Sequence, residues 1–513
     1  MFVCIDHVKI NAVIFNHESK RLYISLSSAK ILTMEKLKRR NNRNELPVRI
    51  MQFGTGNFLR GFADAMIDEA NERTGWDAGV ILVKNTPKGD LNIFRSQDSV
   101  FTVILRGIEN GKAVTKTRYV SCVQDSVNPY NEYGRFLSFA ALPSLRFVIS
   151  NTTEAGIRFN ESDAFDSEPP LTFPGTLTRL LLERFTVFDG SPDAGLIMLP
   201  TELNDDNGEK LKDCVNNYIR LWELPEEFAS WIDTCCVFTS TMVDRIITGF
   251  PREEAEAHWK ELGNRDELLV CGELSASWII ESPVDFSNEF PLAEAGLPVV
   301  FTDTLKPYKT RKVRILNGLH TGMVHTSFLA GNDTVLDTMN DGLTCSFIEA
   351  MLRSEIIPSL PPGISDAVRF AEATLERFRN PYIRHNLLSI SLNSVAKWDA
   401  RCLPSLQSYV EKFGRIPSRI AFSLAALICF YSPERSRGGE TYAIQDTPEV
   451  IRFFDEEKGN DIAHTVQSFL SNTHFHDSDL SSIPGLADTV SAYARLIRTA
   501  GMRAAIKELE NEN

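Results

Sequence analysis

Lys312, Asn317 and His320 are polar residues within the stretch "KVRILNGLH". On a helix that turns by about 100° per residue, Asn317 lies about 140° from Lys312 and His320 falls between them, so the three share one side. A desolvated lysine can donate a proton near neutral pH, and Asn317 and His320 can donate hydrogen bonds to a carbonyl oxygen that gains negative charge. This combination predicts reduction of a carbonyl group without a metal. The spacing alone leaves open a solvated Lys312 and a hydrogen-bonded core histidine.

A glycine-rich turn, "FGTGNFLRGF", separates an apolar run from a helical pattern. Gly54 suits a tight turn that needs positive φ, and Gly56 lets a pyrophosphate approach the backbone at the start of a helix. The third glycine position of the dinucleotide fingerprint holds Leu59, so Gly61 is the candidate for close helix packing. A purely structural turn is the alternative, but the position favours a dinucleotide site. The predicted cofactor contacts are Phe53, Gly54, Thr55, Gly56, Asn57 and Phe58.

The next predicted strand ends at Lys84 and Asn85, in "VILVKNTPKGD". A carboxylate there would bind the ribose 2′-hydroxyl of NAD. Lys84 would tolerate a 2′-phosphate or lie over the edge of the adenine, so these residues leave both NAD and NADP open.

Strand-like and helix-like segments alternate in the first part of the chain. Segments typical of buried strands occur at 48–54, 78–85, 145–156 and 194–203, and helical spacing occurs at 55–75 and 176–185. The alternation predicts a parallel sheet with helices on its faces. From about residue 303, helical patterns dominate: 311–331, 344–360, 364–378, 420–431 and 484–513. We therefore expect an α/β domain over 34–302 and an all-α domain over 303–513.

Composition excludes several classes of partner. The chain has 513 residues and a formal net charge of −14, so it is a poor general binder of nucleic acid or of an anionic membrane. It has no run of about 18 apolar residues that would span a membrane. Nine cysteines at irregular spacing, including the adjacent Cys235 and Cys236, are typical of reduced thiols in a cytoplasmic protein. His474 and His476 form too weak a pattern for a metal site, and we expect no metal.

The first 33 residues lack the basic start, apolar run and small-residue cleavage site of a signal peptide. Met34 begins "MEKLKRRNNRNELPV", a polar and basic segment that often starts a cytosolic protein. Either translation starts at Met34, or residues 1–33 form a poorly ordered arm.

The chain resembles the mannitol dehydrogenase family of polyol-specific long-chain dehydrogenases. In that family an asparagine follows a lysine by five places and a histidine follows it by eight, as in Lys312, Asn317 and His320. The segments that carry the resemblance lie in order between about residues 48 and 446. They are "QFGTGNFLRGF", "SNTTEAGI", "LTRLLLERF", "STMVDRIITGFPR", "KPYKTRKVRILNGLHT", "RFRNPYIRHNLLSISLN" and "GETYAIQD".

The resemblance implies a Rossmann-type N-terminal domain, a helical substrate domain and catalysis in the cleft between them, with NAD as cofactor. It also implies interconversion of D-tagaturonate and D-altronate in hexuronate catabolism, in which NADH gives the hydride and Lys312 gives the proton. Fructuronate or a mannitol-type polyol is the alternative substrate. A non-catalytic NAD-binding protein is a further alternative, which the intact motif disfavours. The oligomeric state is not indicated.

Further site residues follow from the resemblance. Asn151, Thr152 and Glu154 are expected beside the cofactor, unless they form only a strand-end turn. The weaker substrate candidates are Asp244, Arg245, Lys309 and Lys397. An ion pair between the domains is the alternative for Asp244 and Arg245.

Two positions depart from mannitol-type members. Ser389 replaces an arginine, and Lys309 replaces a glutamate, which puts the family's proton-exit route in doubt here. Lys309 also belongs to a cluster of cations that we expect to attract a carboxylate substrate, a solvated surface being the alternative. The cluster consists of Lys306, Lys309, Arg311, Lys312 and Arg314.

Overall fold

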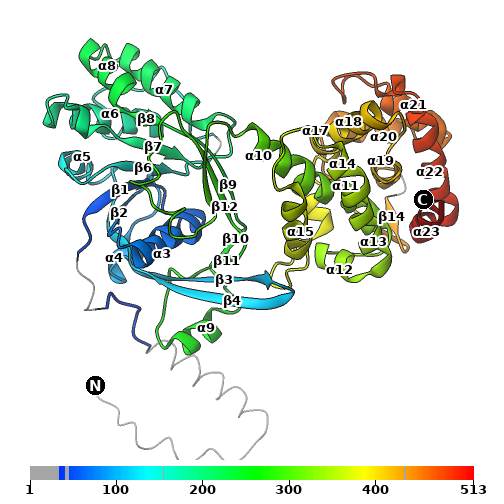
Figure 1. Cartoon of the computed structure of the whole chain (residues 1–513), viewed down its shortest axis with the longest axis horizontal. Helices are drawn as coiled ribbons and strands as arrows, with labels where there is room; N and C mark the ends of the chain where they lie inside the picture. Colours follow the sequence, from blue (N-terminus) through cyan, green and yellow to red (C-terminus); the bar gives the residue numbers. More distant parts are fainter. Residues whose placement is uncertain (1–33, 41–44, 154, 433–434, 513) are drawn as a thin grey trace, which may run out of the picture. The chain divides into compact units, whose positions relative to one another are not determined.

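The structure is a computed structural model that describes residues 34–40, 45–153, 155–432 and 435–512. Its chain divides into two compact units (Figure 1). Unit 1 runs to residue 105 and continues over 116–303, and unit 2 comprises 106–115 and 304–513. The expectation for residues 1–33 falls outside the described residues.

A parallel sheet forms the centre of unit 1. Its strand order is β5-β2-β1-β6-β7-β8, and every neighbouring pair is parallel. The order reverses between β1 and β6, which is the arrangement of a dinucleotide-binding Rossmann fold. The predicted fold class is therefore confirmed. The strands are β1 (Val48–Phe53), β2 (Gly79–Val83), β5 (Val123–Val127), β6 (Phe147–Ser150), β7 (Ile197–Pro200) and β8 (Val237–Phe238).

Alternate residues of these strands face opposite layers, as the period of two in a strand requires. On β1, Met51 and Phe53 pack against the layer of helices α5–α8, whereas Ile50 packs against the layer that contains α3 (Figure 1). The sheet is thus buried on both faces, which explains its continuous apolar runs. The helices of unit 1 are α2 (Asn57–Leu59), η2 (Arg60–Asp64), α3 (Ala65–Thr74), α4 (Asn92–Ser96), α5 (Tyr133–Ser138), η3 (Phe139–Ala141), α6 (Phe173–Val187), η4 (Pro192–Ala194), α7 (Asn207–Leu221), α8 (Glu226–Cys235) and α9 (Ala255–Leu262).

Two further sheets in unit 1 were not predicted. One has the order β10-β11-β3-β4 and the other β13-β12-β9. Most of their strands are short, and much of β4 is exposed, so neither gives a strong apolar pattern. Their strands are β3 (Phe101–Glu109), β4 (Lys112–Val120), β9 (Ser240–Asp244), β10 (Ile247–Gly249), β11 (Val270–Glu273), β12 (Ser277–Glu281) and β13 (Val299–Thr302).

Unit 2 is helical, as predicted, apart from the tip of the β3–β4 hairpin and the two-residue strands β14 (Ser436–Arg437) and β15 (Glu440–Thr441). Its helices are α10 (Lys306–Arg311), η5 (Lys312–Asn317), α11 (Gly318–Leu329), α12 (Val335–Asn340), α13 (Gly342–Ala350), η6 (Met351–Ile356), α14 (Ile357–Ser359), α15 (Ala367–Phe378), α16 (Leu387–Ile390), α17 (Ser394–Arg401), α18 (Leu403–Phe413), α19 (Ser418–Phe430), α20 (Pro448–Glu456), α21 (Ile462–Leu470), η7 (Leu480–Ser482), α22 (Leu486–Ala500) and α23 (Met502–Glu512).

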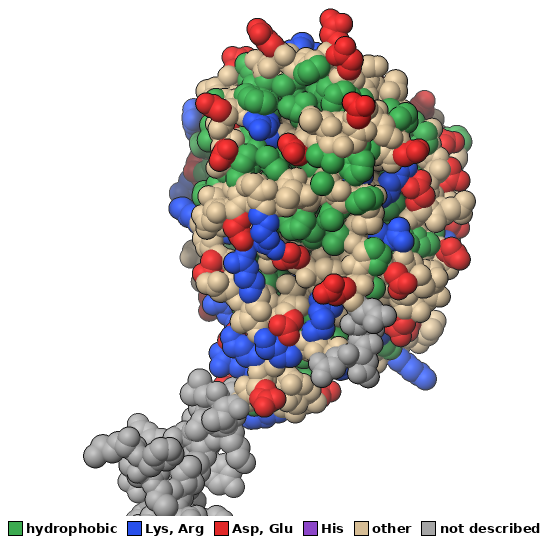
Figure 2. All heavy atoms as spheres, turned by 90° about the vertical axis from the view of Figure 1, so that its left-hand side faces the viewer, with side chains coloured by type: hydrophobic (Ala, Val, Ile, Leu, Met, Phe, Trp, Pro, Cys, Tyr) green, Lys and Arg blue, Asp and Glu red, His purple; other side chains and the backbone are tan. Residues whose placement is uncertain are grey.

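The surface carries both signs of charge. On the face that Figure 2 shows, acidic and basic side chains are interspersed among apolar ones. Within the described residues, no helix combines the length and the apolar character needed to cross a membrane.

Candidate active site

The glycine turn lies between β1 and α2, with its two glycines in different surroundings. Gly54 has a φ of 133°, and a Cβ added there would lie 2.9 Å from Cδ1 of Leu59. At Gly56 an added Cβ would have no heavy atom within 4 Å. Gly54 is therefore required by the turn itself, whereas Gly56 leaves the backbone open to a ligand.

Gly61 supplies a close helix contact, as predicted. A Cβ there would lie 2.7 Å from Cδ1 of Ile247 on β10 and 3.1 Å from Cγ1 of Val270 on β11. The element that approaches so closely is the β10-β11-β3-β4 sheet, not the parallel sheet. The helix that follows the turn is thus held by a layer that the sequence did not reveal.

The other residues predicted at the turn are all near its backbone. Phe53 is buried, Thr55 and Phe58 are partly buried, and Asn57 is exposed. The ring of Phe58 stacks on Phe62 with 5.0 Å between centroids, which anchors the first helical turn. Oδ1 of Asn57 accepts a hydrogen bond of 2.6 Å from Arg60, so its side chain is fixed as well.

The end of β6 adjoins the glycine turn. A Cβ on Gly54 would lie 3.1 Å from the carbonyl oxygen of Asn151, which places the loop after β6 beside the turn. Nδ2 of Asn151 donates to the carbonyl oxygen of Thr201 at 3.0 Å. The backbone N–H and Oγ1 of Thr152 both donate to Oε1 of Glu202 at 2.9 Å. Glu154 lies outside the described residues.

Glu202 is a buried carboxylate that sequence reasoning missed. Burial raises its pKa, and the hydrogen bonds from Thr152 and Ser150 oppose that shift. Because its carboxylate accepts hydrogen bonds from both the backbone N–H and the side-chain hydroxyl of Thr152, Glu202 fixes the loop beside Gly54. No motif marks it, since it lies 50 residues after its partner.

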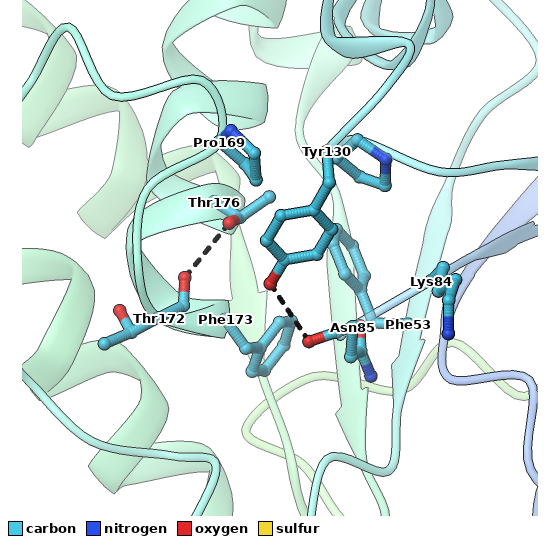
Figure 3. A pocket seen from close by; sticks show the side chains of 9 residues that line it. Phe53, Lys84, Asn85, Tyr130, Pro169, Thr172, Phe173 and Thr176 are labelled. Atoms are coloured by element: carbon cyan, nitrogen blue, oxygen red, sulfur yellow. Dashed lines mark hydrogen bonds between the residues drawn. The ribbon is translucent and has the colours of Figure 1, made fainter. Parts of the chain in front are cut away.

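A small pocket opens beyond the carboxyl ends of β1, β2 and β5 (Figure 3). Tyr130 donates from its hydroxyl to the carbonyl oxygen of Asn85 at 3.2 Å. The Nζ of Lys84 donates to Oγ1 of Thr86 at 3.1 Å. The lining residues are Phe53, Lys84, Asn85, Pro129, Tyr130, Pro169, Thr172, Phe173 and Thr176.

Lys312 and Asn317 lie in unit 2 at the two ends of a π-helical segment, η5. The N–H of Gly318 bonds to the carbonyl oxygen of Val313, five residues earlier, as well as to that of Ile315. In a π-helix, residues five apart are paired through the backbone, so Lys312 and Asn317 share one face more closely than in an α-helix. Short π-helical segments occur frequently at functional sites.

His320 lies in the first turn of α11 and is partly buried. Its Nε2 is inaccessible to solvent and has no hydrogen-bond partner among the described residues. Its ring stacks on Phe378 at 5.1 Å and contacts the edge of His385 at 4.7 Å. Burial, followed by the charges of His385, Arg377, Arg401 and Lys397, lowers the pKa of His320 well below its usual range. The ring is therefore neutral at physiological pH.

The five cations near the motif do not form one patch, contrary to the expectation. Arg314 is buried and donates to Oγ of Ser405 at 2.6 Å and to the carbonyl oxygen of Ser359 at 3.1 Å. Arg311 donates to the carbonyl oxygen of Ser365 and lies over a phenylalanine ring. Arg311 and Arg314 are thus held by other parts of unit 2, whereas Lys306 and Lys309 are exposed.

The weaker substrate candidates have structural partners. The guanidinium of Arg245 donates to the carbonyl oxygens of Gly61 at 3.0 Å and Leu274 at 3.2 Å, all within unit 1. Asp244 is paired in register with Ser277 between β9 and β12. Lys397 donates to the carbonyl oxygen of Ile390 at 3.1 Å, and Lys309 is exposed. Contact of these residues with a substrate stays a prediction.

The two histidines considered for a metal site have different surroundings. His476 is buried and its Nδ1 bonds to Oδ2 of Asp399 at 2.7 Å, whereas His474 is exposed. In the part of the chain that the structure describes, no group of three or more His, Cys, Asp or Glu residues could hold a metal ion.

Known proteins match the chain along most of its length. The family model for the mannitol dehydrogenase Rossmann domain matches residues 48–292, and that for the mannitol dehydrogenase C-terminal domain matches 304–497. The altronate oxidoreductase of Pectobacterium atrosepticum is 42% identical over 485 residues, which cover 92% of this chain and 99% of that protein. That of Enterobacter sp. (strain 638) is also 42% identical, over 93% of this chain and 100% of its own length.

Two solved structures have the same fold at 21% sequence identity. A D-sorbitol dehydrogenase in substrate-free form has a TM-score of 0.76 and covers 94% of this chain and 99% of its own. The Pseudomonas fluorescens mannitol 2-dehydrogenase, in a ternary complex with NAD and D-mannitol, has a TM-score of 0.64 and covers 94% and 98%. From the two domain models and from relatives matched over nearly their whole length, the chain belongs to the mannitol dehydrogenase family.

Proposed function

We propose that the protein is an NAD-dependent oxidoreductase that interconverts D-tagaturonate and D-altronate in hexuronate catabolism. The observation that carries the chemistry is the common π-helical face of Lys312 and Asn317, followed by His320, whose buried Nε2 has no hydrogen-bond partner among the described residues. The substrate is inferred from curated altronate oxidoreductases that are 42% identical over 99% of their length.

The residues at the carboxyl ends of β1 and β6 fit a dinucleotide. A Cβ at Gly56 would meet nothing within 4 Å, so a pyrophosphate can reach the backbone at the start of the helix. The strand order reverses between β1 and β6, and ligands of such sheets bind at this reversal. Gly54, Gly56 and Asn151 would hold the cofactor. Bound NADH supplies the hydride that reduces the keto carbon.

Lys312 donates a proton to the substrate oxygen as the carbonyl is reduced, and in the reverse direction neutral Lys312 accepts it from the hydroxyl group. Asn317 donates a hydrogen bond to the same oxygen while its negative charge develops. His320 is neutral because its pKa is depressed, so it donates through Nε2–H without adding a formal charge. This Nε2, which has no partner among the described residues, would gain a hydrogen bond when substrate binds.

We place the reaction in the cytoplasm. The described residues include eight free cysteines, among them the adjacent Cys235 and Cys236. Free thiols persist in a reducing compartment.

Turnover measurements test the assignment. NADH oxidation is followed with D-tagaturonate, D-fructuronate and D-fructose, and then with NADPH in place of NADH. We expect the highest kcat/KM with tagaturonate and NADH. No turnover of any of the three would refute the enzymatic function, and preference for fructose would refute a uronate substrate.

The proton donor is tested by Lys312→Ala. A positioned general acid contributes about 10²- to 10⁴-fold to the rate, so we expect kcat to fall by that factor. The exposed Lys306, on α10, gives the control variant Lys306→Ala, which should keep wild-type kcat. If kcat of Lys312→Ala falls by less than about tenfold, Lys312 is not the proton donor.

A further inference from the structure

Positive charge surrounds His320, and it comes from residues outside the Lys–Asn–His motif. Besides burial, the groups that depress the pKa of His320 are His385, Arg377, Arg401 and Lys397. All four belong to the stretch of unit 2 between α15 and the end of α17. The charge that acts on His320 therefore comes from a part of unit 2 other than α10 and η5.

Arg401 is held directly against the catalytic helix. A Cβ on Gly318 would lie 2.9 Å from the carbonyl oxygen of Arg401, so α17 approaches the helix between Asn317 and His320. Cys402 donates from its thiol to the carbonyl oxygen of Gly318 at 3.4 Å. Nη1 of Arg401 donates to Oγ1 of Thr321, the residue after His320, at 3.2 Å. The guanidinium is thus fixed beside the helix that carries Asn317 and His320.

Lys397 lies four residues before Arg401 on α17, and two like charges at this spacing destabilise a helix. The pKa values of both residues are lowered, mainly by burial, and Arg401 lowers that of Lys397 further. Within the described residues neither side chain forms an ion pair. Asp399, between them in sequence, bonds to His476.

One carboxylate does act on this pair. Asp446 raises the pKa of Lys397, but its Oδ2 accepts the hydroxyl hydrogen of Tyr431. Lys397 itself donates to a backbone carbonyl. A guanidinium has five N–H donors in a planar fork, and Arg401 uses one on Thr321. The arrangement therefore has donors and positive charge available for an anion.

We propose that Arg401, assisted by Lys397, binds the carboxylate of the substrate and thereby selects a keto sugar acid over the corresponding uncharged keto sugar. This inference rests on the proposed function, because it names the group that recognises the acid end of the hexuronate. Arginine binds carboxylates through two parallel N–H···O bonds, which fix orientation as well as charge. The bound anion would also offset the repulsion between Arg401 and Lys397.

The test compares two substrates that differ at one carbon. D-Tagaturonate carries a carboxylate where D-tagatose carries a CH₂OH group. Charged hydrogen bonds contribute enough that Arg401→Met should lower kcat/KM for tagaturonate by about 10- to 100-fold. The value for tagatose should change by less than about twofold, and Arg401→Lys should recover part of the loss. Where tagatose turns over too slowly, its Ki against tagaturonate replaces kcat/KM.

The matched control is Arg369→Met, because the Arg369 side chain is 82% exposed and pairs with Asp366. This substitution also removes one positive charge, and it should leave kcat/KM for both substrates unchanged. An equal loss of kcat/KM for tagaturonate and tagatose would make Arg401 a structural residue and overturn the proposal. No loss of kcat/KM for either substrate would also overturn it. If the wild type does not reduce tagaturonate, the proposed function itself fails, which is a different outcome.

Discussion

At the scale of single residues, the two glycines of the turn have separable roles. Gly54 has a φ of 133° and a crowded Cβ position, so Gly54→Ala should lower the free energy of unfolding by about 1–3 kcal/mol. Gly56 has ordinary φ and open space, so Gly56→Ala should fold like the wild type. Its added methyl group should raise the KM for NADH by about tenfold, or about 1.4 kcal/mol. Urea unfolding and NADH titration of both variants measure these effects.

The opposite pattern would contradict this separation. If Gly56→Ala bound NADH normally, the open backbone would not be the pyrophosphate contact.

The sequence predicted which residues form the turn, because positive φ and close approach favour glycine. It did not reveal that Gly61 packs on β10 and β11, since Ile247 and Val270 lie about 190 and 210 residues away and no local pattern links them.

At the scale of elements, sequence patterns located the strands and helices but not the local geometry of the helix that carries Lys312, Asn317 and His320. Apolar runs predicted β1, β2, β6 and β7 because a parallel sheet is buried on both faces. The angle of about 140° between Lys312 and Asn317 assumed an α-helix. The structure has a π-helical segment there, which brings the two residues onto one face. No residue type marks this change of hydrogen bonding.

The close approach of α17 to α11 depends on Gly318. An added methyl group would lie 2.9 Å from the carbonyl oxygen of Arg401, which is backbone and cannot rotate away. Gly318→Ala should therefore displace α17, lower stability by about 1–3 kcal/mol and reduce kcat/KM for tagaturonate more than for tagatose. Gly342→Ala, with no atom within 4 Å of its Cβ, is the matched control. Equal kcat/KM values for Gly318→Ala and the wild type would show that the approach is not required.

At the scale of the whole molecule, each unit buries a titratable group with a shifted pKa. The two groups change the stability of the protein with pH in opposite directions. In unit 1, burial raises the pKa of Asp64 to about 7, and its Oδ2 accepts a hydrogen bond from Gln52 below the glycine turn. In unit 2, burial and then Lys397 lower the pKa of His325 to about 3, while its ring bonds to Ser394 at 2.9 Å. Both groups are neutral when the protein is folded near pH 6.

Their contributions to stability change with pH in opposite directions. Folded Asp64 binds more protons than the unfolded residue between about pH 4 and 7, so its contribution falls as pH rises through that window. Folded His325 binds fewer protons between about pH 3 and 6.5, so its contribution falls as pH drops. Each amounts to about 4 to 5 kcal/mol at most, from a pKa shift of about three units or slightly more. With Asp64→Asn, the stability relative to wild type should therefore increase with rising pH, and with His325→Gln it should increase with falling pH. Urea unfolding between pH 4 and 8 measures both slopes, and differences independent of pH would mean that neither group is neutralised by burial.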